Sequence, residues 1–241
     1  MRKLAWFACV LLALAAGAWG QGVKTVTMAF GLTLPPYVID GGSGMEFDII
    51  QRSLDLAGYR LKPVFVPFAR LSVATDDEGV DAAATVTEAS GIKNVFLSDA
   101  HITYQNVVVT LADGLGKIGS LKDLTGKGVL AFQDAGLYLG PEFASFAKGD
   151  KKYAETADQK KQVTMLYVGR VEALVMDVNI FQYFKALSTD QKQPEVISSI
   201  FPPVQYKVAF KDKAVRDLFN EALKKLRASG EYDKILKKYG K

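Results

Sequence analysis

Short apolar runs alternate along most of this 241-residue chain with longer segments in which apolar side chains recur every three or four positions. The first pattern is typical of a buried or half-buried strand, and the second of a helix that covers one. Strands that alternate with helices can form parallel sheets, because each helix carries the chain back to the edge from which the next strand starts. The sequence therefore predicts an α/β protein with largely parallel sheets.

The alternation falls into two successive parts. The strands that it predicts lie at 26–30, 64–66, 81–86, 107–111, 129–132, 171–176 and 204–210, and two closing helices lie at 215–226 and 232–239. Glycine-rich and proline-rich breaks fall near 112–116 and 200–204. Such breaks suit either hinges or ordinary loops, and periodicity does not distinguish between the two.

The first twenty residues have the pattern of an export signal. Arg2 and Lys3 precede an apolar run from Leu4 to about Ala16, and small residues follow. This order is typical of a secretory signal peptide, and the run is too short to span a bilayer comfortably. The alternative is an N-terminal membrane anchor, whereas a lipoprotein is excluded because Cys9 lies inside the apolar run. We expect residues 1–20 to be removed and the mature protein to be periplasmic.

The composition of the remaining chain excludes several classes of protein. Loss of Arg2 and Lys3 leaves 28 basic and 26 acidic residues, too even a balance to indicate a nucleic-acid partner. The only cysteine is lost with the signal, so disulfides and thiolate metal sites are excluded. His101 is the only histidine, nothing at metal-binding spacing surrounds it, and we interpret it as an ordinary polar residue. We expect neither a metal nor a cofactor.

Seven short segments carry a more specific resemblance. They are Pro35–Tyr37, Gly44–Ile49, Gly79–Ala82, Phe96–Asp99, Ser120–Lys127, Gly169–Asp177 and Gly230–Ile235. In this order the chain resembles the family 3 periplasmic solute-binding proteins of ABC importers, over nearly all of its length after the signal. The resemblance implies the type II periplasmic binding protein fold: two α/β lobes, two crossing strands that serve as a hinge, and a ligand cleft between the lobes.

By this resemblance lobe 1 comprises residues 23–110 and 205–241, and lobe 2 comprises residues 111–204. It implies a monomeric binding protein, not an enzyme, that captures a small polar solute for an ABC importer. The solute would be amino-acid-like or amine-containing, and the partner a permease or a membrane receptor. The alternatives are a sensor component that presents its ligand to a receptor, and a lyase or dehydratase on the same scaffold, with Glu88 or Asp177 as its acid or base.

Asp177 is the first candidate ligand residue. It follows the apolar run 171–176, so we expect it at the carboxyl end of a buried strand, where open α/β sheets present ligand contacts. In the family that the chain resembles, an aspartate at this place receives the ammonium group of the ligand. The alternative is a carboxylate that caps the helix after it.

The arginine with which that family's amino-acid binders clamp the ligand carboxylate is missing. Counting back seven residues from Ser98 leads to Gly91, so a standard α-amino acid ligand is in doubt. Arg70 could supply an anion contact from another direction; the alternative is a surface arginine or one paired with Asp76 or Asp77. Lys93 is interpreted as solvated.

Four further residues complete the predicted site. Phe68 lies where the family often places an aromatic ring on the ligand, and its alternative is lobe packing. Thr85 and Thr87 follow the strand that begins at Asp81 and could offer hydroxyls, although a β-branched strand residue needs no ligand to explain it. Tyr37 follows two prolines at the expected mouth of the cleft. We interpret Glu46 as a favourable charge at a helix start.

Overall fold

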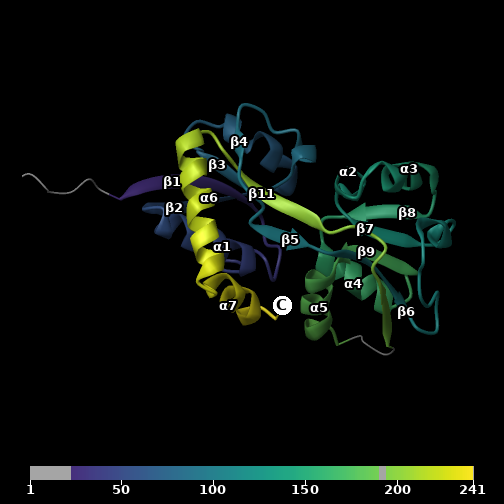
Figure 1. The fold of residues 1–241 in the computed structure, drawn as a ribbon. Helices are drawn as coiled ribbons and strands as arrows, with labels where there is room; N and C mark the ends of the chain where they lie inside the picture. The colour runs from purple at the N-terminus through teal and green to yellow at the C-terminus, as the bar shows by residue number, and fades with distance from the viewer. Residues whose placement is uncertain (1–22, 190–193, 241) are drawn as a thin grey trace, which may run out of the picture.

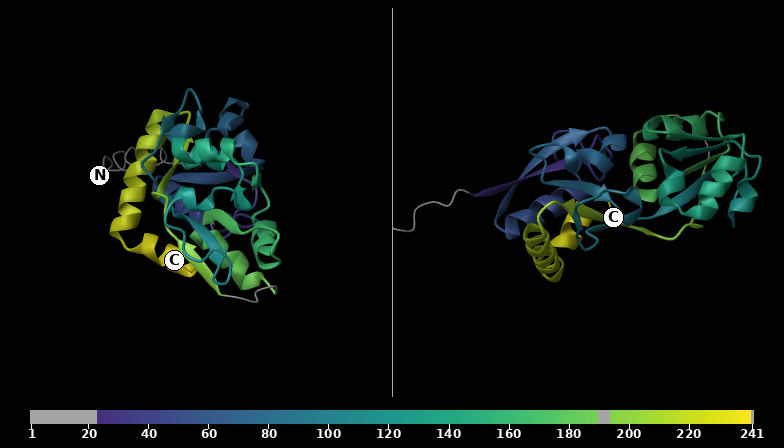
Figure 2. Two further views of the ribbon diagram at one scale, coloured as in Figure 1. Left: turned by 90° about the vertical axis from the view of Figure 1, so that its right-hand side faces the viewer. Right: turned by 90° about the horizontal axis from the view of Figure 1, so that it is seen from above.

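The computed structural model describes residues 23–189 and 194–240, so the predicted export signal lies outside the described residues. Two β-sheets, each covered by helices, form two lobes that lie side by side (Figures 1 and 2). The strands of the first lobe are β1 (Lys24–Gly31), β2 (Tyr59–Val66), β3 (Ala82–Val86), β4 (Phe96–Leu97), β5 (Ile102–Tyr104) and β11 (Val204–Phe210). Those of the second lobe are β6 (Asn106–Leu111), β7 (Val129–Phe132), β8 (Tyr153–Thr156), β9 (Ala173–Asp177) and β10 (Glu195–Ser198).

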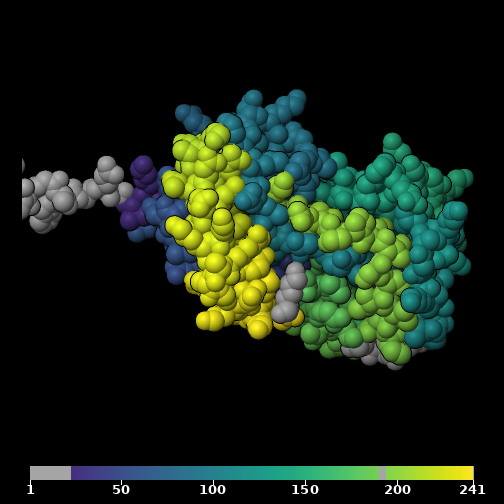
Figure 3. Space-filling model, in the orientation of Figure 1, coloured from purple at the N-terminus to yellow at the C-terminus, as the bar shows by residue number. Residues whose placement is uncertain are grey.

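The helices divide between the lobes in the same way. The first lobe holds α1 (Met45–Leu56), α6 (Lys213–Ala228), α7 (Glu231–Lys238) and the 3₁₀ helices η1 (Phe68–Asp76) and η2 (Glu88–Ser90). The second lobe holds the 3₁₀ helix η3 (Leu121–Leu124), α2 (Ala135–Tyr138), α3 (Pro141–Gly149), α4 (Gln159–Tyr167) and α5 (Val178–Leu187). On the face that Figure 3 shows, α6 and α7 form a ridge over the first lobe, and the segment that carries β11 runs across the junction. No helix among the described residues is long and apolar enough to cross a membrane.

The first sheet has the strand order β2-β1-β3-β11-β4, with β5 paired to β11. Strands β1, β2 and β3 are parallel, and β11 returns antiparallel to β3. The α/β fold predicted from the sequence is confirmed here, as are the two closing helices, which Gly230 separates with a φ of 73°. The prediction of largely parallel sheets is wrong, because both sheets are mixed: β11 in the first sheet, and β6 and β10 in the second, pair antiparallel with their neighbours. Helix α1 packs its apolar face on this sheet through Phe47, Ile50 and Leu54, which are buried.

The second sheet has the order β10-β6-β9-β7-β8 and is covered on both faces. Along β9, Leu174 and Met176 pack in the cluster that contains α4 and α5, whereas Ala173 and Val175 pack in the cluster that contains α2 and α3. A strand that is buried on both faces has no polar alternation, which explains why residues 173–176 are uniformly apolar in the sequence.

The chain crosses between the lobes twice. The first crossing follows β5, and the second lies between β10 and β11, where the break at 200–204 was predicted. The predicted break at 112–116 is not the first crossing, because residues 106–111 already pair with β9 and β10 in the second sheet. The division predicted for lobe 1 therefore includes one strand, β6, that belongs to the second sheet.

Gly31 ends β1 beneath the ring of Phe68. A Cβ atom built on Gly31 would lie 2.1 Å from the ring, and the backbone at Gly31 has no positive φ, so its constraint is steric. We expect Gly31→Ala to lower the free energy of unfolding by about 1–3 kcal/mol through overpacking. In a Phe68→Ala background the same change should cost much less, because the clashing ring is gone.

Chemical denaturation of the two single variants and the double variant measures this coupling. Gly149→Ala is the matched control, because nothing lies within 4 Å of its added Cβ and it has no positive φ. If Gly31→Ala lowers the free energy of unfolding equally in both backgrounds, the ring of Phe68 does not pack against this glycine.

Candidate functional site

A cavity lies between the two lobes and encloses about 700 Å³, its open mouth included. Residues of both sheets and of the crossing segments surround it. Its lining consists of Leu34, Phe68, Leu71, Thr85, Tyr104, Asn106, Phe132, Gln133, Asp134, Tyr138, Thr156, Ala157, Gln159, Asp177, Ile180 and Tyr206. Three of the six predicted site residues are among them: Phe68, Thr85 and Asp177.

Asp177 lies at the carboxyl end of β9, where the sequence predicts it. Its Oδ1 accepts hydrogen bonds from the backbone of Asn179 at 2.8 Å and of Ile180 at 3.1 Å, so it caps α5. Its Oδ2 accepts one from the backbone of Gln105 at 2.8 Å. Burial raises the pKa of this carboxyl to about 6, although these hydrogen bonds act to lower it. The capping alternative is therefore correct, and the same carboxylate also lines the cavity.

Tyr37 does not line the cavity but lies fully buried behind it. Its hydroxyl donates to Oδ1 of Asp177 at 2.9 Å and accepts from the amide of Asn179 at 2.8 Å. Its ring stacks on that of Tyr104, with the centroids 3.7 Å apart. Burial raises the pKa of the Tyr37 hydroxyl well above its usual value, so the hydroxyl remains a donor. Tyr37 thus links the first lobe to the strand end that carries Asp177.

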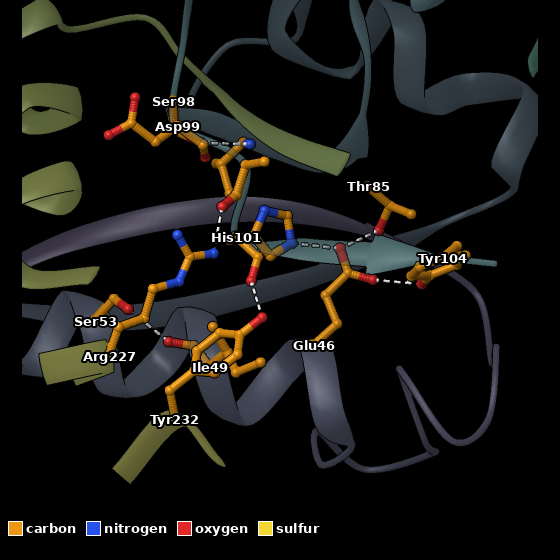
Figure 4. A network of polar contacts seen from close by, with 12 residues as sticks. Glu46, Ile49, Ser53, Thr85, Ser98, Asp99, His101, Tyr104, Arg227 and Tyr232 are labelled. Carbon is orange, nitrogen blue, oxygen red and sulfur yellow. Dashed lines mark hydrogen bonds and ion pairs between the residues drawn. The ribbon is translucent and has the colours of Figure 1, made fainter. Parts of the chain in front are cut away.

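A second buried carboxylate, Glu46, stands behind the cavity wall (Figure 4). Its Oε1 accepts from the hydroxyl of Thr85 at 2.9 Å and lies 2.8 Å from Nε2 of His101. Its Oε2 accepts from the hydroxyl of Tyr104 at 2.7 Å. Glu46 and His101 are both 0% exposed. Three partners around a carboxylate offset the loss of water, and two of them, Thr85 and Tyr104, line the cavity.

The sequence contains a signal for this network. The interpretation of Glu46 as a favourable charge at a helix start does not use it. Glu46 occupies the stripe that Ile49, Ile50 and Ser53 continue at helical spacing, and all four are buried. A carboxylate in an apolar stripe needs a buried partner, and His101 is the one histidine available in the chain.

Thr85 and Thr87 have different surroundings. Thr85 lines the cavity with a φ of 57°, unusual for a β-branched residue, close to the place where the pairing of β3 with β11 shifts register. Its hydrogen bond to Glu46 holds it there. Thr87 instead caps η2, accepting from the backbone of Ala89 at 3.2 Å, and is not among the lining residues.

Arg70 lies outside the cavity, contrary to the role that the sequence suggested. Its guanidinium is 3.3 Å from a carboxylate oxygen of Asp77, and its side chain is 58% exposed. Arg70 lies in the first turn of η1 and is exposed, so the alternative of a surface arginine paired with Asp77 is correct. Lys93 is exposed as well and does not line the cavity. The charged residues of the lining are two aspartates, Asp134 and Asp177.

Several lining residues escaped prediction. Asn106 begins β6 directly opposite Asp177, because β6 runs antiparallel to β9. The rule that sites gather at the carboxyl ends of strands therefore missed it. Tyr104 and Tyr206 lie at the crossing with their ring centroids 4.5 Å apart, and Tyr138 extends from α2 to within 6.0 Å of Tyr206. Aromatic residues in apolar runs give no signal that separates a cavity wall from a core.

The raised pKa of Asp177 predicts a pH dependence of stability. A carboxyl whose pKa is higher in the folded state stabilises the fold below its unfolded pKa, and this contribution is lost as the pH rises through about 6. Relative to Asp177→Asn, which keeps a capping side chain, the wild-type protein should therefore lose about 2 kcal/mol of unfolding free energy between pH 4 and pH 7. Urea denaturation of both proteins across this range measures the difference; a constant difference would contradict the prediction.

The Glu46 network predicts a large effect of a single substitution. Glu46→Ala leaves His101, Thr85 and Tyr104 without their shared partner and should lower the unfolding free energy by about 3–5 kcal/mol. Glu231→Ala is the matched control, because Glu231 pairs with Arg52 at the surface and should cost far less. Denaturation curves that show equal losses for the two variants would refute a structural role for the buried carboxylate.

Comparisons with known proteins place the chain. The sequence profile of the bacterial extracellular solute-binding proteins, family 3, matches residues 26–241. The arginine-binding extracellular protein ArtP of Bacillus subtilis is 26% identical over 250 residues, covering 96% of this chain and 94% of its own. A crystal structure of an ArgBP mutant from T. maritima superposes with a TM-score of 0.71 at 25% identity, covering 90% of this chain and 95% of its own.

A histidine kinase sensor domain, described as similar to periplasmic binding proteins, superposes with a TM-score of 0.76. It is 18% identical and covers 90% of this chain and 96% of its own, so it shows the shared fold. Among the described residues, no group of histidine, cysteine or acidic side chains is placed to hold a metal ion. The match of the family profile to nearly the whole chain is decisive: the chain belongs to family 3 of the bacterial extracellular solute-binding proteins.

Proposed function

We propose that this protein is a periplasmic solute-binding protein that captures a small solute with a positively charged nitrogen, such as an amine or a guanidinium, for an ABC importer. The observation that carries the proposal is the Asp177 carboxylate, which is 2% exposed and lines an aromatic cavity between two lobes. A buried carboxylate in a binding cavity favours a cationic partner, because the partner replaces the water that burial removed.

The hydrogen bonds of Asp177 leave room for that partner. Oδ1 accepts three bonds, from Tyr37, Asn179 and Ile180, whereas Oδ2 accepts one, from Gln105. A carboxylate oxygen has about two acceptor sites, so Oδ2 keeps one for an N–H of the ligand. The four protein donors also fix the carboxylate in place, so the ligand meets a preorganised acceptor.

Contacts between the lobes suit a cleft that closes over its ligand. The hydroxyl of Tyr138, on the second lobe, interacts with Ser90 of η2 on the first. On the other side of the cavity Tyr37 bonds Asp177 and Asn179 across the same junction. Closure of this kind excludes water, which strengthens the attraction of a few charges for a small polar ligand.

The relatives support a cationic ligand. ArtP is named as an arginine-binding protein, and arginine carries a guanidinium and an ammonium group. Family membership supports delivery of the ligand to a membrane transporter or receptor. We rank import ahead of sensing and ahead of catalysis, for which Glu88, now found in an ion pair with Lys207, has no place in the cavity.

The proposal is tested by a thermal-shift screen of the mature protein with amines, guanidines, amino acids and organic acids, followed by calorimetry. A ligand at about a hundred times its dissociation constant adds roughly 2.7 kcal/mol of stability, which moves the melting temperature by several degrees. Asp177→Asn should weaken a cationic hit roughly tenfold or more, because the charge-assisted hydrogen bond is lost.

Arg70→Ala is the matched control and should bind like wild type, because Arg70 faces solvent and pairs with Asp77. Mass spectrometry of the recovered ligand separates binding from turnover. A screen in which only anions bind, or in which Asp177→Asn binds cations as tightly as wild type does, would refute the proposal.

A further inference from the structure

We propose that the ligand is an amine or guanidine that carries a neutral hydrogen-bond acceptor and no carboxylate, for example an amino amide or an amino alcohol. This inference rests on the proposed function and names the class of solute that the same cavity takes. It depends on three separate properties of the lining: its charges, its aromatic rings and the unpartnered amide nitrogen of Asn106.

The charges of the lining are all negative. Asp134 and Asp177 are its only ionisable residues apart from tyrosines, and none of the sixteen lining residues is a lysine, arginine or histidine. Arg70 is held outside by Asp77, and Lys93 is exposed elsewhere. A free amino acid would bring its carboxylate into this cavity next to Asp177 with no cation to compensate it, and an uncompensated buried charge is strongly disfavoured.

Aromatic rings form a continuous wall from the second lobe to the crossing strands. The centroid distances are 6.4 Å from Phe132 to Tyr138, 6.0 Å from Tyr138 to Tyr206 and 4.5 Å from Tyr206 to Tyr104. Phe68 adds a further ring from the first lobe. The negative faces of such rings attract organic cations and also bury an apolar body, whereas they repel a carboxylate.

Asn106 is the reason to expect a hydrogen-bond acceptor on the ligand. Its side chain is 3% exposed, it lines the cavity, and its Nδ2 has no hydrogen-bond partner. A buried donor without an acceptor is costly and rare in native proteins, so a ligand oxygen in this position would gain a strong contact. Asn106 stands opposite Asp177 in the β6–β9 ladder. The lining therefore offers one donor beside one anionic acceptor, which matches a ligand with a neutral oxygen close to its ammonium group.

Two sets of compounds that differ only in the acid group test the inference by calorimetry. The first is arginine, arginine amide and agmatine; the second is phenylalanine, phenylalanine amide and phenethylamine. In at least one set we expect the amide to bind about tenfold or more tighter than the parent acid, and the amine without the oxygen to lie between them.

Asn106→Leu isolates the role of the amide, because leucine has the same branched arrangement of heavy atoms and no donor. The variant should lose the preference for the amide, binding the amide no more tightly than it binds the amine. Its melting temperature without ligand should not fall, since the variant removes an unpartnered buried group.

The outcomes separate this inference from the function on which it rests. If a parent acid binds most tightly and Asp177→Asn weakens it, the ligand class is wrong while a cation-binding function stands. If none of the six compounds binds the wild-type protein, the ligand class and the cation-binding function are both refuted. If Asn106→Leu keeps the preference for the amide, Asn106 is not the acceptor's partner and that part of the inference is overturned.

Discussion

The carboxylate of Asp177 is the interaction on which the junction of the two lobes depends. It ends β9, starts α5, accepts the backbone amide of Gln105 at the first crossing, and accepts the hydroxyl of Tyr37 from the first lobe. Four parts of the chain therefore meet at one side chain. Burial acts against this arrangement by raising the pKa of the carboxyl to about 6, and the four donors are what keep a charge acceptable there. This carboxylate joins both lobes and faces the cavity between them. Any contact that a ligand makes with it therefore depends on the geometry of the lobes, and the reverse also holds.

Glu46 and Asp177 are both buried carboxylates, and their surroundings give them different roles. Glu46 has partners on both oxygens and no access to the cavity, so it positions Thr85 and Tyr104 in the wall. Asp177 lines the cavity itself. The stacked rings of Tyr37 and Tyr104 connect the two networks, since Tyr37 bonds Asp177 and Tyr104 bonds Glu46. Part of the cavity wall therefore rests on a polar layer, and this layer restricts the rotamers of the aromatic residues that line the cavity.

Sequence patterns predicted those parts of the fold that local periodicity determines. The alternation at 204–210, the closing helices and the position of Asp177 at a strand end all follow from spacing along one segment. The first crossing could not be placed in this way, because an apolar strand such as β6 satisfies either sheet equally well. The sequence assigned Arg70 to the ligand site for a related reason. Its neighbours indicate the start of a helix, but they do not indicate whether its side chain points toward the cleft or toward solvent. The pairing of Glu46 with His101 joins residues 55 positions apart, and no local pattern contains that information.

Burial of the Asp177 carboxylate in the cavity wall lowers the stability of the folded protein itself. Asp177 is already desolvated in the folded protein, as its raised pKa records, so an incoming cation would add a charged partner to a carboxylate whose protein partners are neutral donors. On binding, a ligand would lose only its own water of hydration. In an open, hydrated site both the ligand and the carboxylate would lose water on binding. An anion entering the same space gains nothing from this preorganisation and meets aromatic faces and two carboxylates. In the proposed function, the stability given up at Asp177 becomes selectivity for cations, and this preference is set by the folded protein rather than by any contact that the ligand must induce.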